Sequence, residues 1–258
     1  MKLCFDIGNT DIFGGVFCDG KRVAEFRRSS RARPSADELG VFLLQFLDAQ
    51  GLSADTVEDA ALASVVPDCG AEVAEACRRY LKVDPLVLKA GVRTGLKIRT
   101  RNPNEVGADR IANAIAAVDV FPGAPLIVID MGTATTFCAI TADKDYLGGV
   151  IAAGMNLSMQ ALAERTAKLP YVELVQPNEC LGRTTMESIQ SGLYYGHLGM
   201  MRTVIEELQR ETFGGERPKV IGTGGNARFF KATGIFDAYK QDLVLTGLLK
   251  ALELNRKS

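Results

Sequence analysis

The pattern of apolar and polar residues in the first half of the chain predicts three strands followed by alternating helices and strands. The expected elements are strands at 2–5, 12–18 and 22–27, a helix at 35–50, a strand at 59–66, a helix at 70–81 and a strand at 85–88. Asp19-Gly20 separates the second and third strands and is typical of a hairpin, because a tight turn of the favoured hand needs positive φ at its central residues. Ser35 is a suitable N-cap for the first helix, and Gly51 a suitable stop.

The second half begins the same order again. An apolar strand from residue 125 runs into Asp130, and a Gly-containing turn and two further strands follow as far as Gly148-Gly149. Asp6-Ile-Gly-Asn-Thr10 and Asp130-Met-Gly-Thr-Ala134 lie about half the chain length apart, which indicates a duplicated lobe. The remaining expectations are lobes at 1–115 and 116–258, a helix-rich insertion at about 156–212, a strand at 219–221 and a final helix at about 241–254.

The composition narrows the class of protein. The 258 residues include 30 Lys plus Arg and 31 Asp plus Glu, so no excess positive charge favours binding to nucleic acid or to an anionic membrane. The N-terminus reaches Asp6 and Gly8 too early for an export signal, and no run approaches the roughly 18 apolar residues of a membrane span. The six cysteines show no paired spacing, so we expect buried, reduced thiols in a cytoplasmic protein.

The two Asp-X-Gly turns are the first candidates for chemistry. A carboxylate at a strand tip, a Gly that lets backbone amides approach an anion, and side-chain donors after it form a cradle for phosphate. A single such turn is equally well read as an ordinary polar turn. Two copies at equivalent places favour a nucleoside triphosphate, bound by Asp6, Gly8, Asn9 and Thr10 and by Asp130, Gly132, Thr133, Thr135 and Thr136.

A third candidate is Gly107-Ala-Asp-Arg110, where a Gly precedes the first turn of an expected helix. Transfer of a phosphoryl group to an alcohol needs a carboxylate to accept the hydroxyl proton and positive charge on the phosphoryl oxygens. Asp109 and Arg110 are suited to these roles, and the alternative is an exposed polar pair at a helix start.

These motifs resemble a known superfamily, the one that contains sugar kinases, acetate kinase, actin and chaperone ATPases. The short chain and Gly107-Ala-Asp-Arg110, preceded by Asn102-Pro103, are similar to the type III pantothenate kinases. Further agreement comes from Gly148-Gly149, Gly154, Leu169-Pro170, Gln190-Ser191-Gly192 and Gly222-Thr-Gly-Gly225. The resemblance implies an α/β fold of duplicated actin-like (ribonuclease H-like) lobes around a central cleft, with the helical insertion in the second lobe. It implies a homodimer that phosphorylates pantothenate to 4′-phosphopantothenate with ATP and Mg²⁺, the first step of coenzyme A biosynthesis.

The resemblance also implies roles for individual residues. Those on the ATP side are Asp6, Ile7, Gly8, Asn9, Thr10, Asp11, Ile12 and Phe13, with Thr133, Gly222, Gly224 and Gly225. Those on the pantothenate side are Thr100, Gly107, Ala108, Asp109 and Arg110. Gly182-Arg-Thr-Thr185 is similar to a family motif whose Thr binds substrate, often from the partner subunit, and the spacing to Gln190-Ser191-Gly192 favours Thr185 over Thr184. Asp109 is the expected proton acceptor, and Asp130 is expected to hold a monovalent cation, K⁺ or NH₄⁺. Thr100 and Ala153 stand where many relatives carry Tyr and Pro, which leaves the pantothenate end less well defined.

Competing interpretations remain at this stage. Asp6 is a second carboxylate that competes with Asp109 for the role of base, although the resemblance places it near the metal and the phosphates. A non-enzymatic transcription accessory protein is similar to this family throughout, whereas an actin-like or chaperone ATPase would need a longer chain and would not explain Gly107–Arg110. His197, the only histidine, is expected to be structural, so neither a Ser-His-Asp triad nor a zinc site is predicted.

Overall fold

The computed structural model describes residues 1–256, which form two compact units: one of Met1–Asp119 with the chain from Leu243 onward, and one of Val120–Asp242. None of the helices in this part of the chain is long and apolar enough to span a membrane.

The sheet of the first unit is built by five strands in the order β3-β2-β1-β4-β5. They are β1 (Lys2–Ile7), β2 (Asp11–Cys18), β3 (Lys21–Ser29), β4 (Asp59–Ser64) and β5 (Leu86–Val87). β1 pairs antiparallel with β2 and parallel with β4. The expected hairpin at Asp19-Gly20 is confirmed, and both residues have positive φ.

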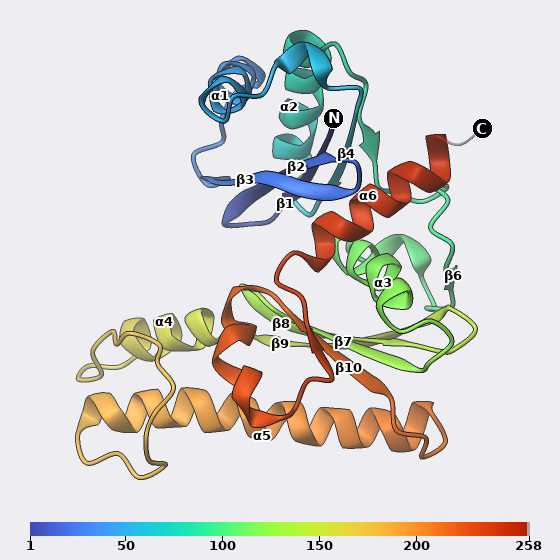
Figure 1. Ribbon diagram of the computed structural model, residues 1–258. Coiled ribbons are helices and arrows are strands. Elements are labelled where there is room, and N and C mark those ends of the chain that lie inside the picture. Colours follow the sequence, from blue (N-terminus) through green and yellow to red (C-terminus); the bar gives the residue numbers. More distant parts are fainter. Residues whose placement is uncertain (257–258) are drawn as a thin grey trace. The chain divides into compact units, whose positions relative to one another are not determined.

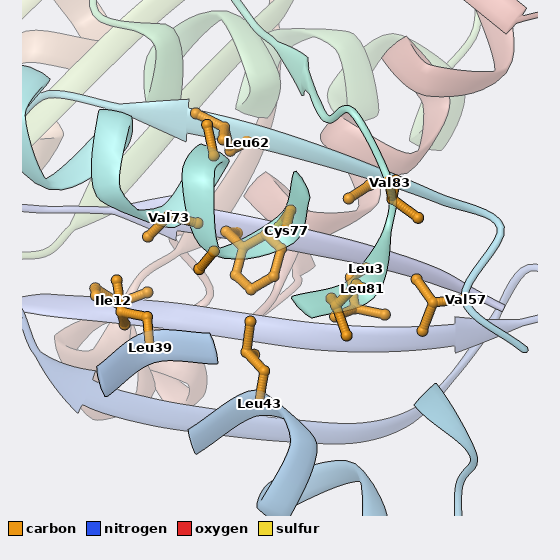
Figure 2. Packing of buried hydrophobic residues seen from close by; sticks show 14 of the residues in the cluster. Leu3, Ile12, Leu39, Leu43, Val57, Leu62, Val73, Cys77, Leu81 and Val83 are labelled. Carbon is orange, nitrogen blue, oxygen red and sulfur yellow. The ribbon is translucent and has the colours of Figure 1, made fainter. Parts of the chain in front are cut away.

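Helices cover both faces of this sheet. On one face lie α1 (Ala36–Ala49) and α2 (Pro67–Ala76), the latter continued by a π-helical turn at Cys77–Leu81 (Figure 1). Their apolar stripes meet the alternate residues of the strands, and Figure 2 shows Leu39 and Leu43 of α1 directed toward this core, with Leu39 beside Ile12. The expected cap is confirmed, because Ser35 and Glu38 form a capping box.

The second unit repeats this arrangement. Its strands run in the order β9-β8-β7-β10-β11, with β7 (Leu126–Met131) antiparallel to β8 (Ala134–Ile140) and parallel to β10 (Lys219–Thr223). The outer strands are β9 (Asp145–Ala153) and β11 (Ala238–Tyr239). The order of strands and the sense of their pairing match those of β3-β2-β1-β4-β5, so the expected duplicated α/β lobes are confirmed.

The insertion of the second unit is rich in helix, as expected, and its two helices are separated by an irregular segment. It contains α4 (Met155–Arg165) and α5 (Thr185–Thr212), while residues 166–184 form neither helix nor strand (Figure 1). Pro170 and Pro177 disfavour a helix in this segment, because proline lacks the backbone donor that a helix interior needs. Val172 of the segment is buried in the core of the unit. After β10, a 3₁₀ helix runs over Gly225–Thr233.

The last helix, α6 (Leu243–Arg256), belongs to the first unit, although the division expected at residues 115/116 placed it in the second lobe. Two glycines let α6 pack closely against its neighbours. A Cβ on Gly247 of α6 would overlap the carbonyl oxygen of Ala112, and a Cβ on Gly15 of β2 would lie 2.9 Å from Leu245 Cδ1 of α6. Ala112 is on α3 (Ala108–Val120).

The cysteines are not all buried as expected. Cys4, Cys69, Cys77 and Cys138 are buried, but Cys18 is half-buried and Cys180 is exposed. All six are free thiols. Burial raises the pKa of Cys77 to about 12, so this thiol stays protonated at neutral pH.

Candidate active site

The first phosphate turn lies between β1 and β2. The Gly8 N–H donates to the carbonyl oxygen of Asp11 at 2.9 Å and closes the turn, and Asp6 pairs with Phe13 in the strand register. Ile7 and Ile12 are buried in the core of the unit, so only their backbone is available to a ligand, whereas Asn9 and Asp11 are exposed. The polar residues predicted for ATP binding therefore lie together on one turn.

Ser30, at the end of β3, holds this turn in place. Its hydroxyl donates to the Gly8 carbonyl oxygen at 2.7 Å, and its N–H donates to the Thr10 carbonyl oxygen at 3.0 Å. Ser30 is only 4% exposed. Ser30 could not be predicted, since nothing local in the sequence shows that the end of the third strand folds beneath the turn.

The second phosphate turn repeats the first. The Gly132 N–H donates to the Ala134 carbonyl oxygen at 3.0 Å, and Asp130 pairs with Thr136 as Asp6 pairs with Phe13. Thr133 is exposed at the tip of the turn.

The Gly-rich segment after β10 packs against the second turn. Gly224 has a φ of +84°, and a Cβ there would lie 2.5 Å from Asp130 Oδ1. Gly222 has a similar constraint, because a Cβ would lie 2.7 Å from the ring of Phe236, while the space beside Gly225 is open. The structure thus brings Asp130 and the predicted adenosine-side glycines together within one unit.

The predicted base lies in the first turn of α3. Asp109 Oδ1 accepts the N–H of Arg110 at 2.8 Å, which fixes the carboxylate at the start of the helix. A Cβ on Gly107 would overlap this same oxygen, so a larger residue there would displace the carboxylate from this position. Asp109 and Arg110 are both half-buried.

Val65 connects this helix start with the first phosphate turn. The Val65 N–H donates to the Ile7 carbonyl oxygen at 3.0 Å, directly beside Asp6. A Cβ built on Gly107 would lie 3.8 Å from Val65 Cγ1. Val65 is therefore next to both the end of β1, which leads into the phosphate turn, and Gly107, two residues before the candidate base.

Two adjacent threonines begin α5 with different surroundings. Thr184 is the N-cap, and its hydroxyl accepts the Glu187 N–H at 3.2 Å within a capping box. Thr185 is exposed and lines a cavity of about 650 Å³, which supports Thr185 rather than Thr184 as the ligand-facing residue. Leu162, Leu169 and Ile189 contribute to the largely apolar lining.

His197 lines the same cavity but is held by backbone groups. Nδ1 lies 2.8 Å from the Leu193 carbonyl oxygen and Nε2 lies 3.2 Å from the Ala153 carbonyl oxygen. The side chain is buried, and these contacts tie α5 to the end of β9, which supports the expected structural role.

Thr100 follows the short strand β6 (Lys97–Ile98) and is half-buried. Its Oγ1 is shielded from solvent and has no hydrogen-bond partner within residues 1–256. A buried hydroxyl without a partner is costly, and a polar group of a bound substrate would satisfy it.

The donor set agrees with a divalent ion that is held mainly by nucleotide. Within residues 1–256 no three His, Cys, Asp or Glu side chains gather as a metal cage. Mg²⁺ in kinases is bound by one or two carboxylates and by the substrate phosphates. Asp6 and Asp130 each place one carboxylate at a phosphate turn.

The two lobes and their turns define a fold class, the actin-like fold that sugar kinases share. A putative 2-dehydro-3-deoxygalactonokinase from Sinorhizobium meliloti has the same fold, with a TM-score of 0.63 at 11% identity over the full length of both chains. A putative Baf family transcriptional activator from Campylobacter jejuni matches with a TM-score of 0.60 at 18% identity, over 99% of this chain and 100% of that one. Likeness at such low identity shows the fold alone.

Sequence comparison identifies the family. Residues 2–207 match the model of the type III pantothenate kinases. A type III pantothenate kinase from Legionella pneumophila (strain Corby) is 48% identical over 255 residues, which cover 99% of each chain. The chain belongs to the type III pantothenate kinase family and is, by this membership, a kinase.

Proposed function

We propose that the protein transfers the γ-phosphoryl group of ATP to the primary hydroxyl of pantothenate and forms 4′-phosphopantothenate, the first step toward coenzyme A. Membership of the family supports the reaction. The observation that supports this assignment of the site is that Val65 donates to the Ile7 carbonyl oxygen, next to the first phosphate turn, and lies close to Gly107, two residues before Asp109.

Asp109 is the general base in this proposal. The hydroxyl oxygen of pantothenate bonds to the γ-phosphorus while its proton moves to the Asp109 carboxylate. The bond between the γ-phosphorus and the β,γ-bridging oxygen breaks, and ADP leaves with the electron pair. Arg110, Ala108 and Gly107 line the substrate side together with Thr100.

The two turns and the Gly-rich segment bind the nucleotide. Asp6 to Phe13 and Thr133 lie on the phosphates, and Gly222, Gly224 and Gly225 lie beside the adenosine. Asp6 would be the carboxylate nearest a bound Mg²⁺, which would supply positive charge for the phosphates. Asp130 would hold a monovalent cation, K⁺ or NH₄⁺.

We further propose a cytoplasmic homodimer in which Thr185 of one subunit reaches the pantothenate of the other. The exposure of Thr185 at the rim of an apolar cavity supports this role. A regulatory role without catalysis is less well supported, because the 48% identical relative is named a kinase, whereas the transcriptional activator shares only the fold.

The test is an assay of purified protein with ATP, Mg²⁺, K⁺ and pantothenate, in which 4′-phosphopantothenate is detected by mass spectrometry. A parallel sample with Na⁺ in place of K⁺ tests the monovalent cation. Absence of product in every cation, from protein that still binds ATP, would contradict the proposed reaction.

Asp109→Asn tests the base. Because general-base catalysis contributes about two to four decades in rate, we expect kcat to fall by that factor while the thermal unfolding curve stays unchanged. A variant with the turnover of the wild type would exclude Asp109 from this role.

A further inference from the structure

Arg27 on β3 stands in register with the phosphate turn. Asp6 of β1 pairs with Phe13 of β2, and Phe13 pairs with Arg27. Directly paired residues on neighbouring strands place their side chains on the same face of a sheet. Asp6, Phe13 and Arg27 therefore form a row across three strands. The row starts at Asp6, two residues before Gly8 of the phosphate turn.

This row lies on the face of the sheet opposite the core that α1 and α2 cover. The strand neighbours of the row, Ile7, Ile12 and Phe26, point the other way and are part of that core. On the face of the row, Leu245 of α6 covers Gly15, whereas Arg27 is exposed. The end of the row at Arg27 is therefore accessible to a ligand.

The Arg27 guanidinium is held in place by an aromatic ring. Its Cζ lies 3.9 Å from the centroid of the Phe13 ring, and Phe13 is only 4% exposed. A planar guanidinium stacked on a ring loses little further freedom when its N–H groups bind an anion. Phe13, predicted to be at the ATP site, thus serves as the platform for a cation.

Arg27 also keeps its charge available. It forms no ion pair with a carboxylate in the described part of the chain, whereas Arg22 on the same strand pairs with Glu25 at 2.8 Å. The next residue, Arg28, lies on the opposite face, where its Cζ is 5.0 Å from the Phe42 ring of α1. Its charge contributes there to lowering the pKa of Glu38, after the larger effect of the hydrogen bonds from Ser35.

From this geometry we propose that Arg27 is a further catalytic residue, which binds the β- and γ-phosphate oxygens of ATP through its guanidinium. Negative charge grows on the β,γ-bridging oxygen as its bond to the γ-phosphorus breaks, and a guanidinium fork is suited to that charge. The inference deepens the proposed function and rests on it for the identity of the nucleotide.

The experiment compares Arg27→Met, Arg27→Lys and Arg28→Met. Binding of ATP, ADP and AMP is measured by calorimetry, and kcat and KM are measured for both substrates. Met keeps the length of the side chain over Phe13 but removes the charge, Lys keeps the charge but loses the fork, and Arg28→Met is the control on the opposite face.

We expect Arg27→Met to lose about 10- to 100-fold in kcat/KM for ATP and in affinity for ATP and ADP, the range for a charged hydrogen bond. Its affinity for AMP should stay unchanged, and Arg27→Lys should recover part of the loss. Arg28→Met should keep wild-type values. If Arg27→Met does not fold, a lower ATP affinity of folded Arg27→Lys with unchanged AMP affinity still supports the proposal.

Wild-type ATP affinity and kcat in Arg27→Met would overturn the inference, as would equal losses for ATP and AMP. If Arg27→Met does not fold, unchanged ATP affinity and kcat in Arg27→Lys would also overturn it. The outcome is separate from that of the proposed function. If the wild-type protein binds ATP but forms no phosphopantothenate, the reaction is wrong, while the nucleotide titrations still decide the role of Arg27.

Discussion

Two adjacent serines at the end of β3 differ in their relation to the phosphate turn. Ser30 is buried and donates to the Gly8 carbonyl oxygen at 2.7 Å, whereas Ser29 is exposed. Ser30 does not need to touch ATP to matter, because it fixes the backbone that presents Gly8 to Thr10. Its role is to position the turn.

Ser30→Ala is expected to raise KM for ATP about 5-fold, since a hydrogen bond contributes about 1 kcal/mol and the turn loses its anchor. KM for pantothenate should stay unchanged. Steady-state kinetics with each substrate varied in turn measures both values, and Ser29→Ala is the control. Equal ATP kinetics in the two variants would show that the anchor does not matter for binding.

Local motifs could be read from the sequence, but contacts across strands could not. The turns at Gly8 and Gly132 are short motifs in which the residue types themselves indicate the chemistry. The roles of Ser30 and Arg27 depend on the register of β3 against β2 and on which face each residue takes, and a shift by one residue would reverse the faces. The single sequence does not fix that register.

At the level of elements, the start of α5 separates a structural threonine from a ligand-facing one. Thr184 accepts the Glu187 N–H, and Thr185 is exposed beside the cavity. The two residues are neighbours of the same type, so each variant controls for the other.

Thr184→Ala should lower the free energy of unfolding by about 1 kcal/mol, because an N-cap is lost, and should leave KM for pantothenate nearly unchanged. Thr185→Ala should do the reverse and raise KM for pantothenate several-fold at unchanged stability. Urea unfolding and steady-state kinetics of both variants test this. A rise in KM confined to Thr184→Ala would reverse the assignment.

Most elements could be predicted because their periodicity and their caps agree. The helix after Ser35 and the strands that flank each phosphate turn were expected and are present. The insertion at about 156–212 was expected to be helix-rich, but the bounds of its helices were not predicted. Residues 166–184 between them form neither helix nor strand and are held by α5: Gln190 Nε2 donates to the Glu173 carbonyl oxygen at 2.9 Å, and Ser191 Oγ donates to the Cys180 carbonyl oxygen. Such tertiary contacts leave no periodic signal in the segment itself.

At the level of the whole molecule, the chain leaves the first unit at Asp119 and returns to it at Leu243. Alternation of elements along the sequence indicated two lobes but not this return. A final amphipathic helix is compatible with either lobe, and the decisive fit of Gly247 against Ala112 joins residues far apart in the sequence. The lobes predicted at 1–115 and 116–258 describe how the sequence was duplicated. The compact units differ from them because α6 packs against β1 and β4 of the first unit.

This return makes the first unit dependent on its last helix. In α6 the leucines at 243, 245, 248, 249 and 252 are buried, and burial of each contributes about 1.5 to 3 kcal/mol. Together they contribute roughly 8 kcal/mol or more, which is comparable to the whole stability of a domain.

A fragment of residues 1–119 should therefore show no cooperative melting by circular dichroism, and addition of a peptide of residues 243–258 should restore it. The continuous fragment 120–242 is the control and should melt cooperatively. Cooperative melting of residues 1–119 alone would show that the sheet and α1 to α3 suffice, and that α6 is an accessory to a unit that is already stable.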